Sequence, residues 1–371
     1  GPIFSLPNIE LEERVAQRLV DLIPCAESVR FLKTGSECTE AAIRVARAAT
    51  CREIVVCARG QYHGWHSWHA ATREEHPGVP AAMTRLVRTF RYNDIGSFDL
   101  ACVSGARRWP DVAAIILEPT LIDPPAPGFL EGVRDRATRL GAVLIFDEMV
   151  TGFRWHAGGA QAYYGVTPDL ACVGKGMGNG YPIAALVGRA DLMRHAMLVS
   201  GTFGGDCIGL AAAAPTLAHY QQGGVTEHMW QIGRLLMEGY NALAEEHTSW
   251  NKRNLPLTRM EGQPPHPVIR WEEVPVYDEQ STVDLRTMKT TPTPNRHRAS
   301  LFFQETIKRG ILFHPEGINI MLAHTEADVE QTLDACRTAM VDVMDAIEKG
   351  DVRERIEGDP ISPEPIWRVA T

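Results

Sequence analysis

Two apolar runs that end in charged residues decide the fold: Gly141-Ala142-Val143-Leu144-Ile145-Phe146 leads into Asp147-Glu148, and Pro168-Asp169-Leu170-Ala171-Cys172-Val173-Gly174 leads into Lys175. Apolar runs of this length, bounded by turn residues, are typical of buried strands in a parallel sheet. In open α/β sheets, ligands bind beyond the carboxyl ends of the strands. A carboxylate and an amine are costly to desolvate, so their presence at that edge requires a chemical reason.

Lysine usage indicates what that reason is. The sequence strongly prefers arginine, and its lysines are only Lys33, Lys175, Lys252, Lys289, Lys308 and Lys349. Lysine can form a Schiff base with an aldehyde and, once freed, act as a base near neutral pH when desolvation lowers its pKa. A lone lysine after a strand can equally cap a helix or pair with an acid. An aldehyde cofactor on Lys175, with its ring nitrogen on Asp147, accounts for both residues together.

Strands and helices alternate along most of the sequence, which predicts a mainly parallel sheet covered on both faces. Besides the two runs above, strands are expected at 30–32, 53–58, 112–117 and 182–187, and helices at 9–22, 38–49, 132–140, 207–220 and 228–246. The proline-rich stretch 251–298 is expected to be a long irregular excursion. Strands at 311–313 and 317–322 and a helix at 326–347 would then complete a second, smaller domain.

Composition excludes several classes of function. The 371 residues carry a net charge of −9, which argues against nucleic acid as a main partner because phosphate binding relies on Lys and Arg. No apolar run approaches the ~20 residues needed to span a bilayer. The N-terminal residues lack a basic stretch followed by an apolar one. The eight cysteines form no C-x-x-C pair and several lie within apolar runs, as expected in a reducing compartment, with the cytoplasm as the default.

Several short motifs point to the same edge of the sheet. Thr34-Gly35-Ser36-Glu37 lies between a strand and a helix, where unpaired helix amides can bind a phosphate, although an ordinary N-cap by Thr34 or Ser36 explains it equally. Glu118 follows an apolar strand directly. Thr202 lies in a glycine-rich loop before a helix and is a second candidate for phosphate binding. No Gly-x-Gly-x-x-Gly opens the helix that follows Thr34-Gly35-Ser36-Glu37, and Gly174-Lys175-Gly176 lacks the spacing of a nucleotide P-loop.

Three histidines, His63, His66 and His69, raise the question of a metal site. Their spacing does not place all three on one helix face, and no Cys or Asp completes a recognisable ligand pattern, so no metal is predicted. Tyr62 and His63 are better interpreted as a polar-aromatic loop at the sheet edge. Tyr62 there could stack on a flat cofactor ring or simply be a core aromatic.

Together these residues resemble the class III, fold type I pyridoxal-phosphate aminotransferases, in the branch of glutamate-1-semialdehyde aminomutase. The matching stretches cover about 300 residues in family order: Thr34-Gly35-Ser36-Glu37, Tyr62-His63-Gly64, Leu117-Glu118-Pro119, Phe146-Asp147-Glu148-Met149-Val150-Thr151-Gly152-Phe153-Arg154, Gly158-Gly159-Ala160-Gln161, Gly174-Lys175-Gly176, Gly180-Tyr181-Pro182-Ile183, Gly201-Thr202-Phe203 and Ala323-His324-Thr325-Glu326. The resemblance implies a mainly parallel seven-stranded sheet flanked by helices. It also implies three regions: residues 1–9 as a remnant of an N-terminal segment, 10–222 as a large cofactor-binding domain, and 223–371 as a smaller α+β C-terminal domain.

The resemblance also implies roles for individual residues. Lys175 and Asp147 would be catalytic, with Lys175 holding pyridoxal phosphate as an internal aldimine and Asp147 keeping the pyridine nitrogen protonated. Cofactor contacts are implied for these two and for Gly35, Ser36, Tyr62, His63, Glu118, Met149 and Thr202. Gly35 and Ser36 would bind the phosphate, Tyr62 and Met149 would cover the two ring faces, and Thr202 would reach the phosphate of a neighbouring subunit in a homodimer.

The expected function is therefore transfer of an amino group from a small-molecule amino donor to a keto or aldehyde acceptor. Two alternatives remain: an aminomutase of the glutamate-1-semialdehyde type, which shifts the group within one molecule, and an inactive shortened homologue that acts as a binding subunit. The family carries a substantial segment ahead of the position of Phe4-Ser5-Leu6-Pro7, where this sequence starts, so that segment is expected to be missing. The intact Lys175, Asp147 and Tyr62 favour an active enzyme.

Overall fold

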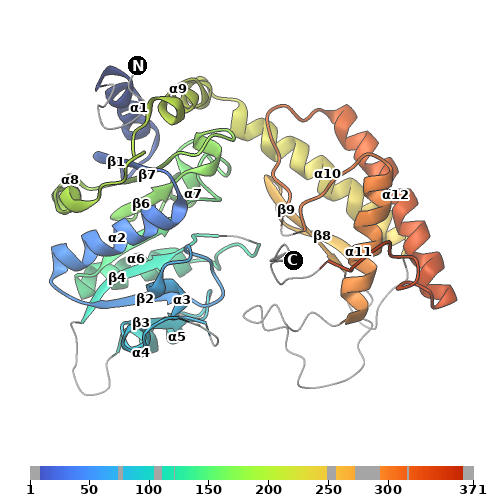
Figure 1. Ribbon diagram of the computed structural model, residues 1–371, viewed down its shortest axis with the longest axis horizontal. Coiled ribbons are helices and arrows are strands. Elements are labelled where there is room, and N and C mark those ends of the chain that lie inside the picture. Colours follow the sequence, from blue (N-terminus) through green and yellow to red (C-terminus); the bar gives the residue numbers. More distant parts are fainter. Residues whose placement is uncertain are drawn as a thin grey trace, which may run out of the picture. The chain divides into compact units, whose positions relative to one another are not determined.

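A computed structural model describes residues 9–73, 78–103, 111–120, 122–248, 256–271, 293–315 and 317–361 (Figure 1). The chain divides into two compact units, Gly1–Thr226 and Glu227–Thr371. The first unit contains the strands β1 (Ser28–Leu32), β2 (Ile54–Ala58), β3 (Val87–Phe90), β4 (Val112–Leu117), β5 (Val143–Asp147), β6 (Leu170–Val173) and β7 (Ala184–Gly188). Its longer helices are α1 (Ile9–Leu22), α2 (Gly35–Thr50), α5 (Ile95–Cys102), α6 (Phe129–Leu140) and α9 (Cys207–Gln222).

Short helical segments complete this unit: α3 (Ser67–Ala70), α4 (Ala81–Thr84), α7 (Gly159–Tyr164), η1 (Lys175–Met177), α8 (Ala190–Met193) and η2 (Arg194–Leu198). The strands form one seven-stranded sheet in the order β1-β7-β6-β5-β4-β2-β3. Only β7 runs against its neighbours, pairing antiparallel with both β1 and β6. The predicted mainly parallel seven-stranded sheet is therefore confirmed. The carboxyl ends of six strands and the amino end of β7 meet at one edge.

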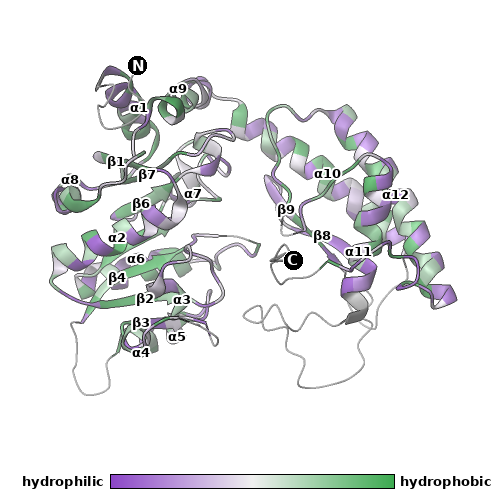
Figure 2. Cartoon of the chain, viewed as in Figure 1, coloured by the Kyte–Doolittle hydropathy of each residue, from purple (hydrophilic) through white to green (hydrophobic). Residues whose placement is uncertain are grey.

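Alternation along the strands builds a core on each face of the sheet, because successive side chains point to opposite sides. In β6, Leu170 and Cys172 face α2 and α8, whereas Ala171 and Val173 face α1 and α9. Nearer the other end of the sheet, α5 and α6 cover the face opposite α2. In Figure 2 the central strands are accordingly hydrophobic along their length. Both faces of the sheet are thus covered, which leaves its edges as the places where polar side chains can gather.

The second unit combines helices with a small antiparallel sheet. Its elements are α10 (Val225–His247, whose first two residues belong to the first unit), β8 (Thr258–Gln263), β9 (His266–Trp271), α11 (Thr293–Lys308) and α12 (Glu326–Lys349). The two strands form a hairpin, and Tyr240, Trp271 and Phe302 pack together in the core. None of the helices in the described ranges combines the length and hydrophobicity needed to cross a membrane.

Two predictions for this unit are wrong. The stretch expected to be irregular contains the β8–β9 hairpin, and α11 begins at its end; residues 251–255 and 272–292 lie outside the described residues. Conversely, no strand forms at 311–313 or in the described part of 317–322. Ile318 N–H donates to Pro267 O (2.8 Å) and Ile320 N–H to Pro265 O (3.3 Å). Because proline has no N–H to donate in return, these contacts do not develop into a ladder.

Candidate active site

Three ionisable residues lie side by side at the edge of the sheet where the parallel strands end. Asp147 is the last residue of β5, Glu118 follows β4 directly, and Lys175 follows β6. The register pairs Leu117 with Phe146 and Asp147 with Cys172, so the three positions follow one another across adjacent strands. The sequence predicted this edge correctly because each strand has a readable apolar run before its polar residue.

The Asp147 carboxylate is buried and held from two directions. Its exposed fraction is 3%, its Oδ2 lies 2.9 Å from His63 Nδ1, and its Oδ1 accepts a hydrogen bond from the Met149 N–H at 3.2 Å. Burial of a charged group is tolerated when hydrogen bonds compensate for the lost water. The carboxylate is therefore fixed in orientation by donors from two different elements.

Glu118 is the second buried acid of the site. Its Oε1 accepts the Tyr62 N–H at 3.0 Å, while the Gln61 side chain pairs with the Glu118 backbone through bonds of 2.9 and 2.8 Å. Burial, and then the nearby charge of Asp147, raise the pKa of Glu118 to about 7, against the opposing effects of His63, the Tyr62 N–H and Lys175. Glu118 can therefore change its charge near neutral pH.

Lys175 occupies an unusual backbone conformation. Its φ of +43° lies in the left-handed region, which few residues other than glycine adopt. The side chain is exposed, and within the described parts of the chain its amine forms no hydrogen bond or ion pair, although its charge acts on Glu118. Residues held in such sparsely populated conformations cluster at functional sites. The amine is thus available to a ligand at the sheet edge.

The start of α2 presents a candidate anion site beside this edge. Thr34 caps the helix with a full capping box, in which its hydroxyl accepts the Glu37 N–H and the Glu37 carboxylate accepts the Thr34 N–H. Thr34 is therefore the N-cap residue of α2, as one of the two interpretations of the sequence expected. Ser36 Oγ instead accepts the Trp65 N–H (3.3 Å). The N–H groups at the start of α2 point beyond the helix, where an anion is favoured.

Gly64 allows the loop after β2 to lie in close contact with the start of α2. Its φ is +93°, and a Cβ at this position would lie 2.5 Å from Ser36 Oγ. Only glycine fits both the conformation and the close approach. The loop carries Tyr62, a residue that is 57% exposed and whose ring meets His69 edge-on at 5.7 Å. Tyr62 is therefore an aromatic surface at the site and not a core residue.

Met149 lies beneath the same region. It is 8% exposed, and a Cβ on Gly35 would come within 3.0 Å of its Cγ, while one on Gly174 would come within 2.8 Å of its Sδ. The two glycines thus leave room for the thioether between the ends of β1 and β6. Met149 thus lies between Gly35 at the start of α2 and Gly174, the residue before Lys175.

Thr202 stands apart from the other predicted residues. It lies exposed in a turn, and a Cβ on the adjacent Gly201 would be 3.8 Å from Glu37 Oε1, so this loop passes the first turn of α2. Thr202 forms no hydrogen bond with the other predicted site residues in the described chain. Its expected contact with a neighbouring subunit stays a prediction.

The three histidines of the loop have separate surroundings. The His63 and His69 rings lie 5.4 Å apart, whereas His66 stacks on Trp65 at 5.2 Å. Burial, followed by the charges of His63 and Arg73, lowers the pKa of His69 to about 3. His69 and Gln61 were not identified from the sequence as site residues, because only the tertiary fold shows that they contact the backbones of His63 and Glu118.

Glu148, next to Asp147, faces the other way and has a structural role. It is completely buried and accepts the N–H groups of Ala160 and Gln161 (2.5 and 3.1 Å) and the Thr151 hydroxyl (2.9 Å). Burial raises its pKa despite these bonds. Asp147 and Glu148 therefore have different surroundings, because successive side chains at the end of a strand point to opposite sides. Asp147 lies at the candidate site, whereas Glu148 holds the start of α7, where Ala160 and Gln161 lie.

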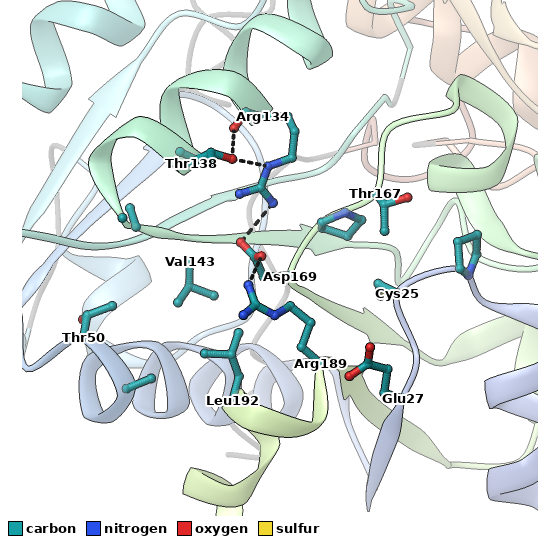
Figure 3. A pocket seen from close by; sticks show the side chains of 16 residues that line it. Cys25, Glu27, Thr50, Arg134, Thr138, Val143, Thr167, Asp169, Arg189 and Leu192 are labelled. Carbon is teal, nitrogen blue, oxygen red and sulfur yellow. Dashed lines mark hydrogen bonds and ion pairs between the residues drawn. The ribbon is translucent and has the colours of Figure 1, made fainter.

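A pocket of about 580 Å³ lies at the opposite edge of the sheet and contains none of the predicted site residues (Figure 3). Asp169 stands in it between Arg134 (2.9 Å) and Arg189 (3.0 Å) and also accepts the Leu144 N–H (2.8 Å). These bonds tie the starts of β5 and β6 to α6 and to the end of β7. The pocket is therefore associated with strand anchoring and not with the ionisable groups at the other edge.

The groups at the active edge fit pyridoxal phosphate. Asp147 is an oriented acceptor for a protonated ring nitrogen, and Lys175 offers an exposed amine to an aldehyde. The start of α2 suits a phosphate, and the glycines around Met149 leave a narrow space beside a thioether that can pack against a flat ring. Each functional group of the cofactor thus has a chemically matching residue.

Comparisons with known proteins agree with this chemistry. Residues 3–252 match the family described as aminotransferase class-III. Two proteins named glutamate-1-semialdehyde 2,1-aminomutase are similar: that of Roseiflexus castenholzii is 34% identical, covering 94% of this chain and 81% of its own length, and that of Desulforamulus reducens is 33% identical, covering 91% and 79%.

Solved structures give the same picture. The chain resembles the PLP internal aldimine form of the FumI protein of Sphingopyxis sp. MTA144, with a TM-score of 0.79 and 26% identity over 93% of this chain and 78% of that one. An omega-transaminase from Sphaerobacter thermophilus, 24% identical, superimposes with a TM-score of 0.78 over 92% and 80% of the two chains. The latter likeness establishes the fold.

Proposed function

The chain belongs to the class III aminotransferases, and from this premise we propose that Lys175 and Asp147 are the residues with which it transfers amino groups. The predicted family, fold and cofactor are confirmed: the protein is a pyridoxal-phosphate-dependent enzyme of fold type I, and its substrates are a small-molecule amino donor and acceptor. The observation that carries the residue assignment is the exposed amine of Lys175, which has no partner among the described residues and whose backbone is held in a left-handed conformation at the sheet edge of Asp147 and Glu118.

When bound, pyridoxal phosphate supplies an electron sink that stabilises negative charge on the carbon next to the amino group. In the proposal, the Asp147 carboxylate holds the proton on the ring nitrogen, and its two hydrogen-bond donors keep it oriented for that purpose. Lys175 Nζ would hold the aldehyde carbon of the bound cofactor. As a general base and acid, Nζ would take the proton from the substrate Cα and return one.

The remaining contacts position the cofactor. We assign the phosphate to Gly35 and Ser36 at the start of α2, and the two ring faces to Tyr62 and Met149. Glu118 supports one of these faces, because it accepts the Tyr62 N–H and so fixes the backbone that carries the ring. His63 reaches the cofactor site through Asp147.

The second candidate reaction is the aminomutase one. It is favoured by the relatives at 33–34% identity, which carry that name. Both reactions use the same lysine and aspartate, so the residues described above serve either one. They differ in whether the keto product leaves: a transaminase releases it, whereas an aminomutase keeps the carbon skeleton bound until the amino group has returned.

We also propose a homodimer in which Thr202 reaches the partner's site. Support comes from exposed apolar side chains around the Thr202 loop, with exposed fractions of 84% for Met197, 89% for Leu198 and 49% for Phe203. Exposed apolar patches of this kind mark protein interfaces. A cytoplasmic location is proposed because all eight cysteines are free thiols.

The lysine assignment is tested by adding pyridoxal phosphate, recording the visible spectrum, reducing with borohydride and mapping the modified peptide. We expect one adduct, on Lys175. Lys175→Arg keeps the positive charge but cannot form the adduct, so it should bind the cofactor without being modified, and it should not turn over substrate. An adduct on another lysine, or wild-type turnover by Lys175→Arg, would refute the assignment.

A donor scan separates the two reactions. Single amino donors are added one at a time, without an acceptor, and the spectrum and the released keto compound are followed. A transaminase converts the bound cofactor to its aminated form and releases one keto product per site. Conversion of glutamate-1-semialdehyde to its isomer, with no keto product released, would contradict the transaminase proposal and support the aminomutase reaction.

A further inference from the structure

Lys33 lies where a cation is not expected. It directly precedes Thr34, the N-cap of α2, and the start of a helix carries a partial positive charge that disfavours cations. Only 20% of its side chain is exposed, and its Nζ donates to the Pro182 carbonyl at 2.6 Å. Because an ammonium is costly to bury without an anion, this position requires a negatively charged partner.

Asp206 supplies that anion and caps a second helix at the same time. Its Oδ2 forms an ion pair with Lys33 Nζ. Its Oδ1 accepts the N–H groups of Ile208 and Gly209 (3.1 and 3.2 Å) at the start of α9. A Cβ on Gly209 would lie only 3.3 Å from Lys33 Nζ, so the lack of a side chain there leaves room for the pair. One carboxylate therefore ties the start of α9 to the residue before the cap of α2.

The ion pair closes the end of the loop that carries Thr202. Two backbone hydrogen bonds of 3.0 and 3.2 Å fold this loop, residues 201–206, into successive turns. A Cβ on Gly204 would lie 2.7 Å from the Phe31 carbonyl oxygen, so the middle of the loop packs directly against β1. Thr202 stays exposed. The loop is thus held by β1 and by its last residue, while Thr202 remains accessible to another molecule.

From this arrangement we infer that Lys33 is a positioning residue, which holds the loop 201–206, and with it Thr202, through the ion pair with Asp206. The inference rests on the proposed dimer in which Thr202 reaches the site of the partner subunit. A loop that is already held in one conformation loses less freedom when a phosphate binds to it, so the ion pair raises cofactor affinity without touching the cofactor. Because the loop serves the other subunit, Lys33 acts on the partner's site and not on its own.

Substitutions can remove the ion pair while keeping the helix cap. Asp206→Asn removes the charge but keeps a side-chain oxygen that can cap α9. Lys33→Met keeps an unbranched apolar stem without the ammonium. The control is Arg136→Met, which breaks the ion pair with Asp99 between α6 and α5, elsewhere in the same unit.

Millisecond hydrogen–deuterium exchange of the cofactor-free protein tests the hold on the loop. We expect the peptide that contains residues 201–206 to exchange about 10-fold faster in Asp206→Asn and in Lys33→Met, because a hydrogen bond between charged groups is worth about that factor. The double variant should also be about 10-fold faster and not about 100-fold, since the two side chains act as one pair. Arg136→Met should leave the peptide unchanged. Wild-type exchange in both single variants, or losses that add in the double variant, would overturn the inference.

Mixed dimers test which site Lys33 serves. One chain carries Lys175→Arg, so the visible adduct reports pyridoxal phosphate binding only at the site whose Lys175 is intact. With Lys33→Met on the Lys175→Arg chain, the intact site receives Thr202 from the altered chain, and the dissociation constant should rise about 3- to 10-fold. With Lys33→Met on the chain whose Lys175 is intact, it should stay unchanged.

The two measurements separate the inference from the proposal beneath it. A loss of affinity that is as large or larger when Lys33→Met lies on the chain with the intact Lys175 would overturn the inference, because Lys33 would then act on its own site through the Pro182 carbonyl. If the loop exchanges faster but neither placement lowers the affinity, the proposed reach of Thr202 into the partner's site fails and the hold of Lys33 on the loop stands.

Discussion

The buried carboxyl of Glu118 makes the stability of the first unit depend on pH. Burial and the charge of Asp147 raise its pKa from the usual 4.5 to about 7. The folded protein therefore binds this proton more tightly than the unfolded chain does. The sign follows from linkage: stability falls as pH rises from about 4.5 to about 7, and the loss is complete above the folded pKa. Glu118→Gln removes the titration and keeps the shape of the side chain.

The size of the effect follows from the two pKa values. One pKa unit is worth about 1.4 kcal/mol, so with a folded pKa of about 7 ionised Glu118 costs the fold on the order of 3 kcal/mol above pH 7. Most of this cost is absent at about pH 5, and most of it is present at about pH 8. The advantage of Glu118→Gln over wild type should therefore grow by on the order of 2 kcal/mol across this range, or about 4–8 °C in melting temperature for a unit of this size.

Scanning calorimetry of the cofactor-free protein between these pH values measures the difference directly. Asp94→Asn is the control: Asp94 is a partly exposed helix cap whose pKa is lowered, first by the Ser97 N–H bond, so it stays ionised throughout the range. Its curve should run parallel to that of wild type. Parallel curves for Glu118→Gln and wild type, or a variant that loses stability relative to wild type as pH rises, would refute the reasoning.

Three further results are expected. His69, whose pKa burial lowers to about 3, should show no protonation between about pH 5 and pH 8 in an NMR titration, and a midpoint within that range would contradict its burial. Gly159→Ala should destabilise the protein by at least about 2 kcal/mol, because φ is +80° and the new Cβ would overlap Glu148 Oε2. The control is Gly165→Ala, which has a φ of +70° and open space around it and should destabilise the protein less. Equal melting temperatures of the two variants would disprove the clash. Among the cysteines only Cys51 is exposed, so a thiol reagent should modify it first, as peptide mapping would show.

Much of the candidate site could be predicted because the motifs are local. Asp147 and Lys175 each follow an apolar run, and parallel strands deliver their carboxyl ends to one edge, so their proximity follows from pattern alone. The capping box of Thr34 and Glu37 is likewise encoded within four consecutive residues. Local signals failed in the β8–β9 hairpin, where the prolines suggested an irregular stretch although Thr258 and Met260 alternate as buried residues at the start of β8.

Other residues could not be predicted because their role depends on contacts far apart in the sequence. Gln61 pairs with the backbone of Glu118, 57 positions away, and His63 meets Asp147, 84 positions away. In the same way, nothing near Glu148 distinguishes it from Asp147 until Ala160 and Gln161 are seen to donate to it. A side chain's partner is a property of the fold, since hydrogen bonds depend on distance and angle and not on spacing along the chain.

The sequence by itself determined the alternation of strands and helices and the residues that end each strand, because periodicity and turn residues act over a few positions. The family and its cofactor followed from the resemblance of these motifs to the class III aminotransferases. Only the tertiary structure decided that the pKa of Glu118 is raised, that His63 lies against Asp147 and that the Lys175 amine has no hydrogen-bond partner among the described residues. These properties arise from burial and from neighbouring charges, which exist only once distant segments have packed together.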